Sequence, residues 1–297
     1  MATERSSTFI GTQIGTETAH GTGVAATIKL IGIQVTPQVK VDTKEIRSGN
    51  LFADAYALGR DWTEAKFEGA PYYEMMETIT KSALCTGAGG VHTVSNTTDN
   101  EYTSYTFQVG NASYVESFTG GTFTGFNVKY TPEEITIAGD IIGNQMSVPG
   151  TWTAGIAAPT GTIILPGHCT VSVSGATQTR VLSAEFDISG RFKPLYVLNG
   201  SYTSVAMVET APDSTVKIEV EADTEGIAHL TRLRAGNTAV NVILQATNGT
   251  RTFKIECACQ VKELDSFKIS DTTYNVAYTL GVVYSSTIGY AIKVTNS

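Results

Sequence analysis

The stretch of sequence that decides the fold runs from Trp62 to Leu84. It begins Trp62-Thr-Glu-Ala-Lys-Phe-Glu-Gly69 and continues Ala70-Pro-Tyr-Tyr-Glu-Met-Met-Glu-Thr-Ile-Thr-Lys-Ser-Ala-Leu84. The first part is typical of a short strand. In the second part, Tyr72, Met75, Met76, Ile79 and Ala83 recur at helical spacing, which indicates an amphipathic helix. Proline in the first helical turn costs no hydrogen bond, so Pro71 is expected there. The stretch therefore predicts a strand followed directly by a helix.

The same order of elements returns in the second half of the chain. Thr215-Val-Lys-Ile-Glu-Val-Glu-Ala222 alternates apolar and charged residues, as a half-buried strand does. Asp223 is a suitable N-cap, and Gly236 is a suitable stop for a helix between them. We therefore interpret the protein as one strand–helix–strand unit that is used twice.

Composition favours strands over long helices. The chain has 297 residues, enough for about two domains, with 41% apolar and 16% charged residues. Its many Thr, Val, Ile and Tyr residues fit pleated sheets better than helices. The net charge of −8 argues against a protein that grips nucleic acid phosphates, because such a protein needs a basic surface. We expect a mainly β protein with a few short helices.

The charge is distributed unevenly along the chain. Up to Val148 there are 16 acidic against 9 basic residues, a balance of −7, whereas the remainder has 12 against 11, a balance of −1. Chance variation of the surface explains this difference as well as an acidic face that must not bind an anion. Both interpretations stay open.

The sequence also suggests where the domains begin and end. Residues 1–27 are rich in Thr, Gly and Ala, and they bury too little apolar surface to fold alone. They are interpreted either as a disordered tail or as an N-terminal arm that becomes ordered on a neighbouring subunit. Pro149, Pro159 and Pro166 mark a boundary, so residues 28–148 and 149–297 are the expected domains. The polar segment 86–100 is expected to be an exposed loop.

Targeting and redox signals are weak. The N-terminus Met-Ala-Thr-Glu-Arg lacks an apolar core, and no apolar run approaches the length of a membrane span. Membrane insertion is therefore not expected. Synthesis in the cytoplasm with reduced thiols is therefore expected. Cys257 and Cys259 lie two apart, so they point to one face of a strand and cannot easily form a disulfide with each other. His168 beside Cys169 would be half of a metal site, but no second pair at ligand spacing accompanies it.

The sequence lacks the common motifs of catalysis and of cofactor binding. The chain has no Gly-x-Ser-x-Gly elbow, no Gly-Lys-Ser/Thr phosphate loop and no His-Glu-x-x-His pair. The Gly-rich segment after Cys85 follows a helix rather than a strand, which is the wrong order for a nucleotide loop. We expect neither an enzyme nor a cofactor.

Three passages of the chain carry a resemblance to a known family. The first is Ile14-Gly-Thr-Glu-Thr-Ala-His-Gly-Thr22, which contains the pattern Glu-Thr-x-x-Gly-Thr. The second is the strand-to-helix step from Phe67 to Met76, and the third runs from Ser117 to Tyr130 and on through Ile135 to Ile141. With these passages the chain resembles the major tail proteins, or tail tube proteins, of long-tailed non-contractile bacteriophages. In the third passage, Gly121 and Thr122 replace the Cys or Lys that is usual in the family.

The resemblance implies a fold of two tandem tail-tube-like β-sandwich or barrel domains, each with one flanking helix on the outer side. It implies rings that stack into a tube through which the genome passes without specific binding. A duplicated chain would form a trimer with pseudo-sixfold symmetry, whereas a single-unit protein would need a hexamer. The implied partners are the tape measure, tail terminator and distal tail proteins, and the implied location is the virion tail.

Particular residues follow from this resemblance. Residues on polar strand faces are candidates for the lumen, although simple exposure on the outside explains each of them equally well. These candidates are Asp140, Glu185, Asp187, Glu219 and Glu221. In the arm, the candidates for contact between rings are Ile10, Ile14, Glu17 and Thr22.

Two other classes of function compete with this hypothesis. One is a carbohydrate-binding or decoration β-sandwich module of a virion, whose expected mark is an exposed aromatic platform built on Trp62 or Trp152. The other is a β-rich hydrolase, although no nucleophile and base are visible as a set. Tyr72, Tyr73, Met75 and Met76 would be either core residues or an exposed contact stripe.

Overall fold

The protein is described here from a computed structural model. It describes residues 10–48, 51–85, 87–198, 203–222, 231, 238–265, 268–270 and 273–297. The predicted helix between Asp223 and Gly236 lies outside these residues, apart from Thr231.

The expectation of a mainly β fold is confirmed, because strands account for 57% and helices for 6% of the residues. The first half contains β1 (Gly11–Thr16), β2 (Ile28–Leu30), β3 (Ile33–Ile46), β4 (Ala55–Gly69), α1 (Tyr73–Ala83), β5 (Val91–Thr93), β6 (Tyr105–Asn111), β7 (Tyr114–Tyr130) and β8 (Ile135–Gly143). The second half contains η2 (Pro166–His168), β9 (Cys169–Val173), β10 (Ala176–Gln178), β11 (Val181–Ser189), β12 (Phe192–Leu195), β13 (Ala206–Glu209), β14 (Asp213–Glu221), β15 (Val240–Thr247), β16 (Thr252–Leu264), β17 (Lys268–Ser270), β18 (Thr273–Val282) and β19 (Ile292–Asn296).

A long antiparallel sheet runs through both halves of the molecule. Its strands follow one another in the order β3–β4–β8–β7–β11–β14–β18–β16, and we call it the long sheet. Two smaller side sheets branch from it, with the orders β2–β1–β6–β7 and β10–β9–β15–β16. Strands β7 and β16 therefore each belong to the long sheet at one end and to a side sheet at the other.

The strand order is used twice. Strands β3, β4, β8, β7, β6, β1 and β2 of the first set correspond, in this order, to β11, β14, β18, β16, β15, β9 and β10 of the second set. The registers agree as well. Lys66-Phe67-Glu68 on β4 occupies the place of Lys217-Ile218-Glu219 on β14, with Lys66 opposite Asp140 and Lys217 opposite Thr279. The two halves thus repeat one arrangement of strands.

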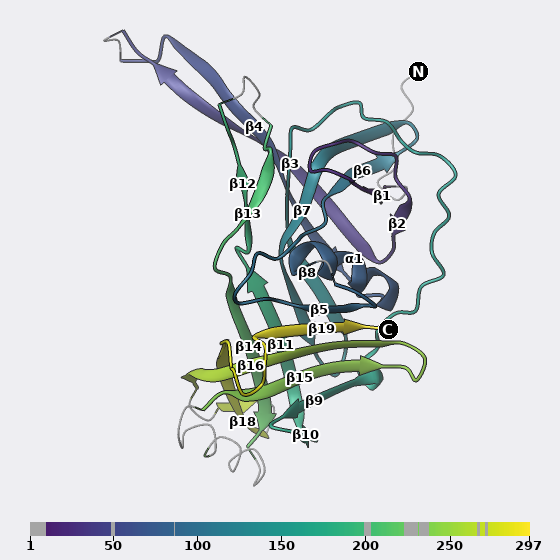
Figure 1. Cartoon of the computed structure of the whole chain (residues 1–297), viewed down its shortest axis with the longest axis vertical. Coiled ribbons are helices and arrows are strands. Elements are labelled where there is room, and N and C mark those ends of the chain that lie inside the picture. Colours follow the sequence, from purple (N-terminus) through teal and green to yellow (C-terminus); the bar gives the residue numbers. More distant parts are fainter. Residues whose placement is uncertain are drawn as a thin grey trace.

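The two sets are joined by hydrogen-bonded strands rather than by a flexible linker. Strand β7 pairs with β11, and β19 of the second half pairs with β5 of the first. The predicted boundary at Pro149 falls in the segment 144–165, which we call the strap and which runs from β8 to η2 around the outside of the molecule (Figure 1). Thr153 holds the strap to the first side sheet, because its backbone bonds the buried side chains of Gln13 and Gln108.

The helix α1 fills the space on the core side of the long sheet. The prediction of a helix here is confirmed, and eight of its eleven residues are buried. Its apolar side packs against β7, and Tyr73, Met75 and Met76 are core residues rather than an exposed stripe. Tyr72 is the N-cap, so Pro71 lies before the helix instead of in its first turn. Asn296 near the C-terminus donates to Thr80 Oγ1 at 2.9 Å, which ties β19 to the helix.

Two expectations about irregular segments were wrong. Residues 10–27 are not a free arm, because Gly11–Thr16 forms β1, which lies between β2 and β6 of the same chain. The polar segment 86–100 is not simply an exposed loop, because Val91–Thr93 forms β5 and its His92 is fully buried. In both cases a short polar strand is stabilised by a partner that is remote in sequence.

A buried arginine connects the two halves of the molecule. Arg191 is 1% exposed, its Nη2 lies 2.9 Å from Glu209 Oε1, and its Nε donates to the carbonyl of Leu84 at the end of α1. Glu209 also accepts hydrogen bonds from the backbone and side chain of Asn100. Burial lowers the pKa of Arg191, and the carboxylate of Glu209 opposes that shift.

We expect Arg191→Ala to destabilise the protein by about 3–5 kcal/mol, because it leaves the Glu209 carboxylate and the Leu84 carbonyl without their partner. The matched control is Arg251→Ala, which removes an exposed arginine 3.1 Å from Glu74 and is expected to cost less than about 1 kcal/mol. Chemical denaturation followed by circular dichroism measures both. Equal losses for the two variants would contradict this assignment.

Candidate functional site: the polar face of the long sheet

One face of the long sheet is polar and the other is part of the core. Residues directly opposite each other on paired strands share a face, so the registers show which residues belong together. On the core face Phe67, Val128, Phe186 and Ile218 are buried. On the opposite face, which we call the polar face, most side chains are half-buried or exposed. This polar face continues across the strands of both repeats.

All five predicted lumen candidates lie on the polar face. Asp140 is on β8, Glu185 and Asp187 are on β11, and Glu219 and Glu221 are on β14. The prediction placed them on polar strand faces, and the structure brings them onto a single surface.

Lysines divide these carboxylates. The register aligns Lys129, Glu185 and Lys217 in one row across β7, β11 and β14. Asp140 lies opposite Lys66 of β4 in another row. Opposite charges in such cross-strand pairs attract each other and neutralise part of the local field. The acidic residues nevertheless outnumber the lysines, so the face as a whole is negative.

Hydrogen bonds fix the carboxylates at the centre of the face. Asn127 on β7 donates through Nδ2 to Glu185 Oε1 at 2.5 Å and to Asp187 Oδ1 at 3.4 Å. Partial burial raises the pKa of Asp187 above its ordinary value of 3.8, and Glu185 adds to the rise, while the Asn127 hydrogen bond and Lys217 oppose it. The negative charge of Asp187 is therefore held in place at some cost in stability.

The carboxylates of β14 have partners too. Glu219 accepts hydrogen bonds from Ser183 at 3.4 Å and from Asn275 at 3.3 Å. Glu221 forms an ion pair with Arg180 at 2.6 Å. Asp140 is exposed. The five candidates therefore differ in how much of their charge they present to the surroundings.

Further charged residues of the polar face were missed by the sequence analysis. The repeated Lys-x-Glu pattern, Lys66-Phe67-Glu68 and Lys217-Ile218-Glu219, was the signal that would have found some of them. The acidic residues that were missed are Glu64, Glu68, Asp213 and Glu263. The lysines on this face are Lys40, Lys66, Lys129 and Lys217.

The predicted arm residues are not brought together in one site. Ile14 is fully buried in the core and Ile10 is 54% exposed, while Thr22 is also exposed. Glu17 is buried, and its carboxylate accepts hydrogen bonds from the backbone of Gly21 and Gly120 and from two hydroxyl groups. Ile14 and Glu17 thus lie in the interior of the chain, and the inter-ring role of the four residues stays a prediction.

A contact between His20 and Ser204 resembles part of a nucleophilic site, but its geometry is structural. His20 Nε2 lies 2.9 Å from Ser204 Oγ, and that hydroxyl donates to Asn144 Oδ1 at 2.6 Å. Ser204 is buried. Burial lowers the pKa of His20, which favours the neutral ring, and Glu17 opposes the shift. The contact holds the loop after β1 against the second half.

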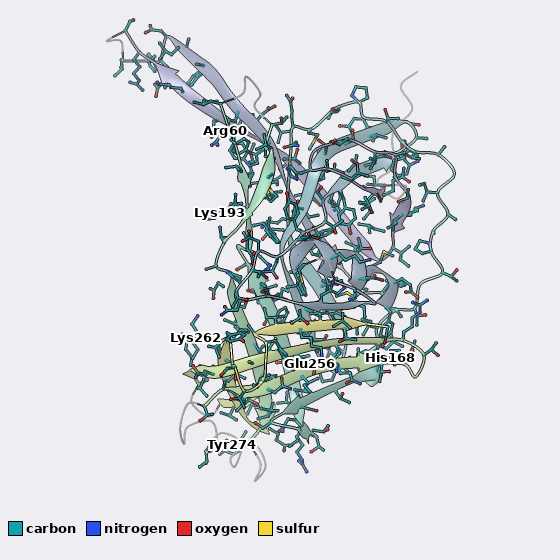
Figure 2. All side chains as sticks on the ribbon, in the orientation of Figure 1. Arg60, His168, Lys193, Glu256, Lys262 and Tyr274 are labelled. Atoms are coloured by element: carbon teal, nitrogen blue, oxygen red, sulfur yellow. The ribbon has the colours of Figure 1, made fainter. Side chains whose placement is uncertain are left out.

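Two neighbouring hairpins carry most of the large apolar side chains that are exposed. The β3–β4 hairpin projects from the body, and the β12–β13 hairpin stands beside its root (Figure 1). Arg60, on β4, connects the two hairpins, because its guanidinium lies 4.5 Å from the ring centre of Tyr196 (Figure 2). Within the β3–β4 hairpin, the same guanidinium lies 2.7 Å from Asp42. The exposed apolar residues are Val39, Val41, Ile46, Leu51, Phe52, Tyr56, Leu195, Val197, Leu198, Val205 and Val208. A monomer rarely exposes so much apolar surface in one place unless it binds a partner.

The marks of the competing functions are weaker. Trp62 lies on β4 and Trp152 in the strap, and among the described residues neither ring pairs with another aromatic ring to make a platform. No group of three or more His, Cys, Asp or Glu side chains suited to a metal ion occurs within the described ranges. His168 Nδ1 instead lies 3.3 Å from the hydroxyl of Tyr73.

Comparison of the chain with protein-family models finds no match, and comparison with curated proteins finds none either. In the described part of the chain, the helices are too short or too polar to cross a bilayer.

We expect Asp187→Asn to raise the free energy of unfolding at about pH 7 and to leave it unchanged at about pH 3. The pKa of Asp187 is higher in the folded than in the unfolded state, so its charged form costs stability at neutral pH. That cost disappears as the pH falls through the folded-state pKa. Denaturation series at several pH values measure the difference. Asp213→Asn, with its side chain 78% exposed on the same strand face, is the control and is expected to change little. A destabilising effect of Asp187→Asn at neutral pH would contradict the argument.

Proposed function

We propose that the protein is the structural subunit of a phage tail tube, and that its polar face lines the lumen through which the genome passes. The observation that carries the proposal is the polar face itself, which extends without interruption over both repeats of the chain. The resemblance of three sequence passages to tail tube proteins supports the same proposal. The role is structural, without catalysis or a cofactor, and the place of action is the virion tail after synthesis in the host cytoplasm.

The charge of the polar face suits this role. DNA carries closely spaced negative charges, and it binds strongly to surfaces that neutralise them with lysine and arginine. A surface with a net excess of carboxylates repels the phosphates. The lysines aligned with Glu185 and Asp140 divide the field into small opposing regions, so DNA meets neither a strong attraction nor a single large barrier.

The repeat and the hairpins suit assembly. Two equivalent strand sets in one chain favour a ring of three copies with pseudo-sixfold symmetry over a hexamer. A ring closes because the same heterologous contact returns to its start, and stacking of rings repeats a second contact without closure. The exposed apolar side chains of the two hairpins provide such a second surface. The tape measure, tail terminator and distal tail proteins are the proposed partners at the ends and in the lumen.

The purified protein is expected to form rings or hollow tubes at high concentration or with a short seed. Size-exclusion chromatography and negative-stain electron microscopy measure this. A protein that stays monomeric in every condition and binds glycans would contradict the proposal and favour the carbohydrate-binding alternative.

Reversal of charge on the polar face is expected to make tubes retain DNA. The variant combines Glu185→Lys, Asp187→Lys, Glu219→Lys and Glu221→Lys, and the control carries Asp99→Lys and Glu101→Lys in an exposed loop. Sedimentation of tubes with double-stranded DNA is the measurement. Wild-type and control tubes should leave DNA in solution, whereas the variant tubes should carry it down, and added salt should release it. Retention that is equal in the variant and the control would remove these carboxylates from the lumen.

Polar substitutions at the tip of the β3–β4 hairpin are expected to stop stacking without unfolding the subunit. Leu51 and Phe52 are 83% and 80% exposed, so Leu51→Ser with Phe52→Ser removes little buried surface from the free subunit. The melting temperature should stay constant, while electron microscopy should show single rings in place of tubes. Tyr274→Ser, at another exposed aromatic residue, is the control, and it should leave the tubes unchanged. Tubes of normal length from the double variant would exclude the hairpin tip from stacking.

A further inference from the structure

The joint between the two repeats is a template for a joint between two copies of the chain. In the order of the long sheet, β7 is the last strand of the first repeat and β11 is the first strand of the second, and they pair with Val128 opposite Phe186. In the repeated strand order, β16 takes the place of β7, and β3 takes the place of β11. These two strands are at the opposite ends of the long sheet. In the described part of the chain, β3 pairs only with β4, so its outer edge has no strand partner.

We propose that the end of β16 of one copy, at Leu264 and the following Asp265, pairs antiparallel with the outer edge of β3 of a second copy. Leu264 would lie opposite Val39 and Asp265 opposite Gln38, as Phe126 and Asn127 lie opposite Ile188 and Asp187 in the β7–β11 joint. The inference rests on the proposed function, because such a joint repeated from copy to copy produces a ring. It adds the identity of the two strands, their register and the groove that receives the joint.

The register follows from the neighbouring strands. Thr36 on β3 lies opposite Lys66, just as Glu185 on β11 lies opposite the equivalent Lys217. Gln38 and Val39 are therefore the equivalents of Asp187 and Ile188, which follow Glu185 by the same number of residues.

The second strand is aligned by its bulge. The pairing of β7 with β8 shifts between Phe123 and Gly125, and the pairing of β16 with β18 shifts between Val261 and Glu263. Gly125 thus corresponds to Glu263, and Asn127 corresponds to Asp265. Because Asn127 lies opposite Asp187 in the chain, Asp265 of one copy is placed opposite Gln38 of the next.

Burial of Val39 supports the joint. Its side chain is 52% exposed, whereas its equivalent in the completed joint, Ile188, is 1% exposed. Strand β7 lies beside Ile188, with Phe126 opposite it. A second copy on the β3 edge would cover Val39 in the same way.

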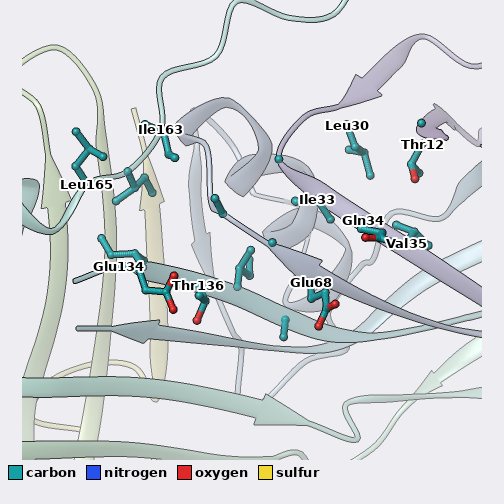
Figure 3. A pocket seen from close by; sticks show the side chains of 18 of the residues that line it. Thr12, Leu30, Ile33, Gln34, Val35, Glu68, Glu134, Thr136, Ile163 and Leu165 are labelled. Atoms are coloured by element: carbon teal, nitrogen blue, oxygen red, sulfur yellow. The ribbon is translucent and has the colours of Figure 1, made fainter. Parts of the chain in front are cut away.

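A wide groove lies at the proposed joint (Figure 3). It has a volume of about 1290 Å³. Its equivalent in the second repeat has only about 250 Å³, because Tyr130, Thr131 and Pro132 at the end of β7 line it there. The matching residues of the first groove are Gly11, Thr12, Lys29, Leu30, Gly32, Ile33, Gln34 and Val35. Those of the second groove are Cys169, Thr170, Gln178, Thr179, Val181, Leu182, Ser183 and Ala184.

The correspondence identifies the occupant of the large groove. The end of β7 narrows the groove of the second repeat within the chain. Its counterpart is β17 (Lys268–Ser270), which follows β16, so β17 of a second copy is expected to narrow the groove of the first repeat. Pro37 takes the place of Phe186 in the β3 edge. Proline has no N–H group to donate, so at this position it contributes at most its carbonyl to the joint.

Disulfide cross-linking tests the register. The variant with Gln38→Cys and Asp265→Cys, assembled and then oxidised with copper phenanthroline, is expected to give covalent oligomers up to the closed ring on non-reducing gels. Each single variant should give none, because Cys85, Cys257 and Cys259 are buried and Cys169 is half-buried. The matched control is Asn127→Cys with Asp187→Cys, which has the same register inside one chain and should close a bond without changing the oligomer size.

The outcomes separate this inference from the proposed function. Rings that form without a Gln38–Asp265 cross-link, while the control pair does close, would overturn the joint and leave the tube proposal intact. If electron microscopy shows no ring in any condition, the tube proposal fails and the joint fails with it. Val39→Asp supplies a second measurement. It should keep the melting temperature of the subunit and raise the concentration needed for assembly roughly tenfold, because an apolar contact is lost. Unchanged assembly of Val39→Asp would contradict the joint.

Discussion

The rest of the structure depends on the antiparallel pairing of β7 with β11. In the order of the long sheet, this pairing joins the last strand of the first repeat to the first strand of the second, so the two sets of strands form one continuous sheet. Phe126, Val128, Phe186 and Ile188 bury apolar surface on one side of this joint. On the other side, Asn127 holds the carboxylates of Glu185 and Asp187. A slip of the register by one residue would exchange these two sides, so the hydrophobic core and the polar face are fixed by the same contact.

Local patterns were enough to predict some elements. The helical spacing from Tyr72 to Ala83 identified α1, and the alternation from Thr215 to Glu221 identified β14. In each of these cases the residues that decide the structure are neighbours in the chain. The polar alternation also placed Asp140 and the four carboxylates of β11 and β14 on polar strand faces.

Contacts between remote residues could not be predicted in this way. Strand β1 has a Gly- and Thr-rich sequence, and it is a strand because β6, more than 90 residues later, offers it a full edge. His92 is buried because β19 at the end of the chain pairs with β5. The single polar face required the register between β7 and β11, which no local pattern contains. The sequence could therefore supply the candidate residues for the face, but it could not place them on one surface.

The unequal hairpins of the two repeats have a consequence for the proposed tube. The β3–β4 hairpin is long and projects freely, while the β12–β13 hairpin at the equivalent position is shorter and leans on its neighbour through Tyr196. A ring built from these chains would alternate long and short projections around its rim. The next ring would then fit at every second position only, so the difference between the repeats would restrict the rotation of one ring on the next.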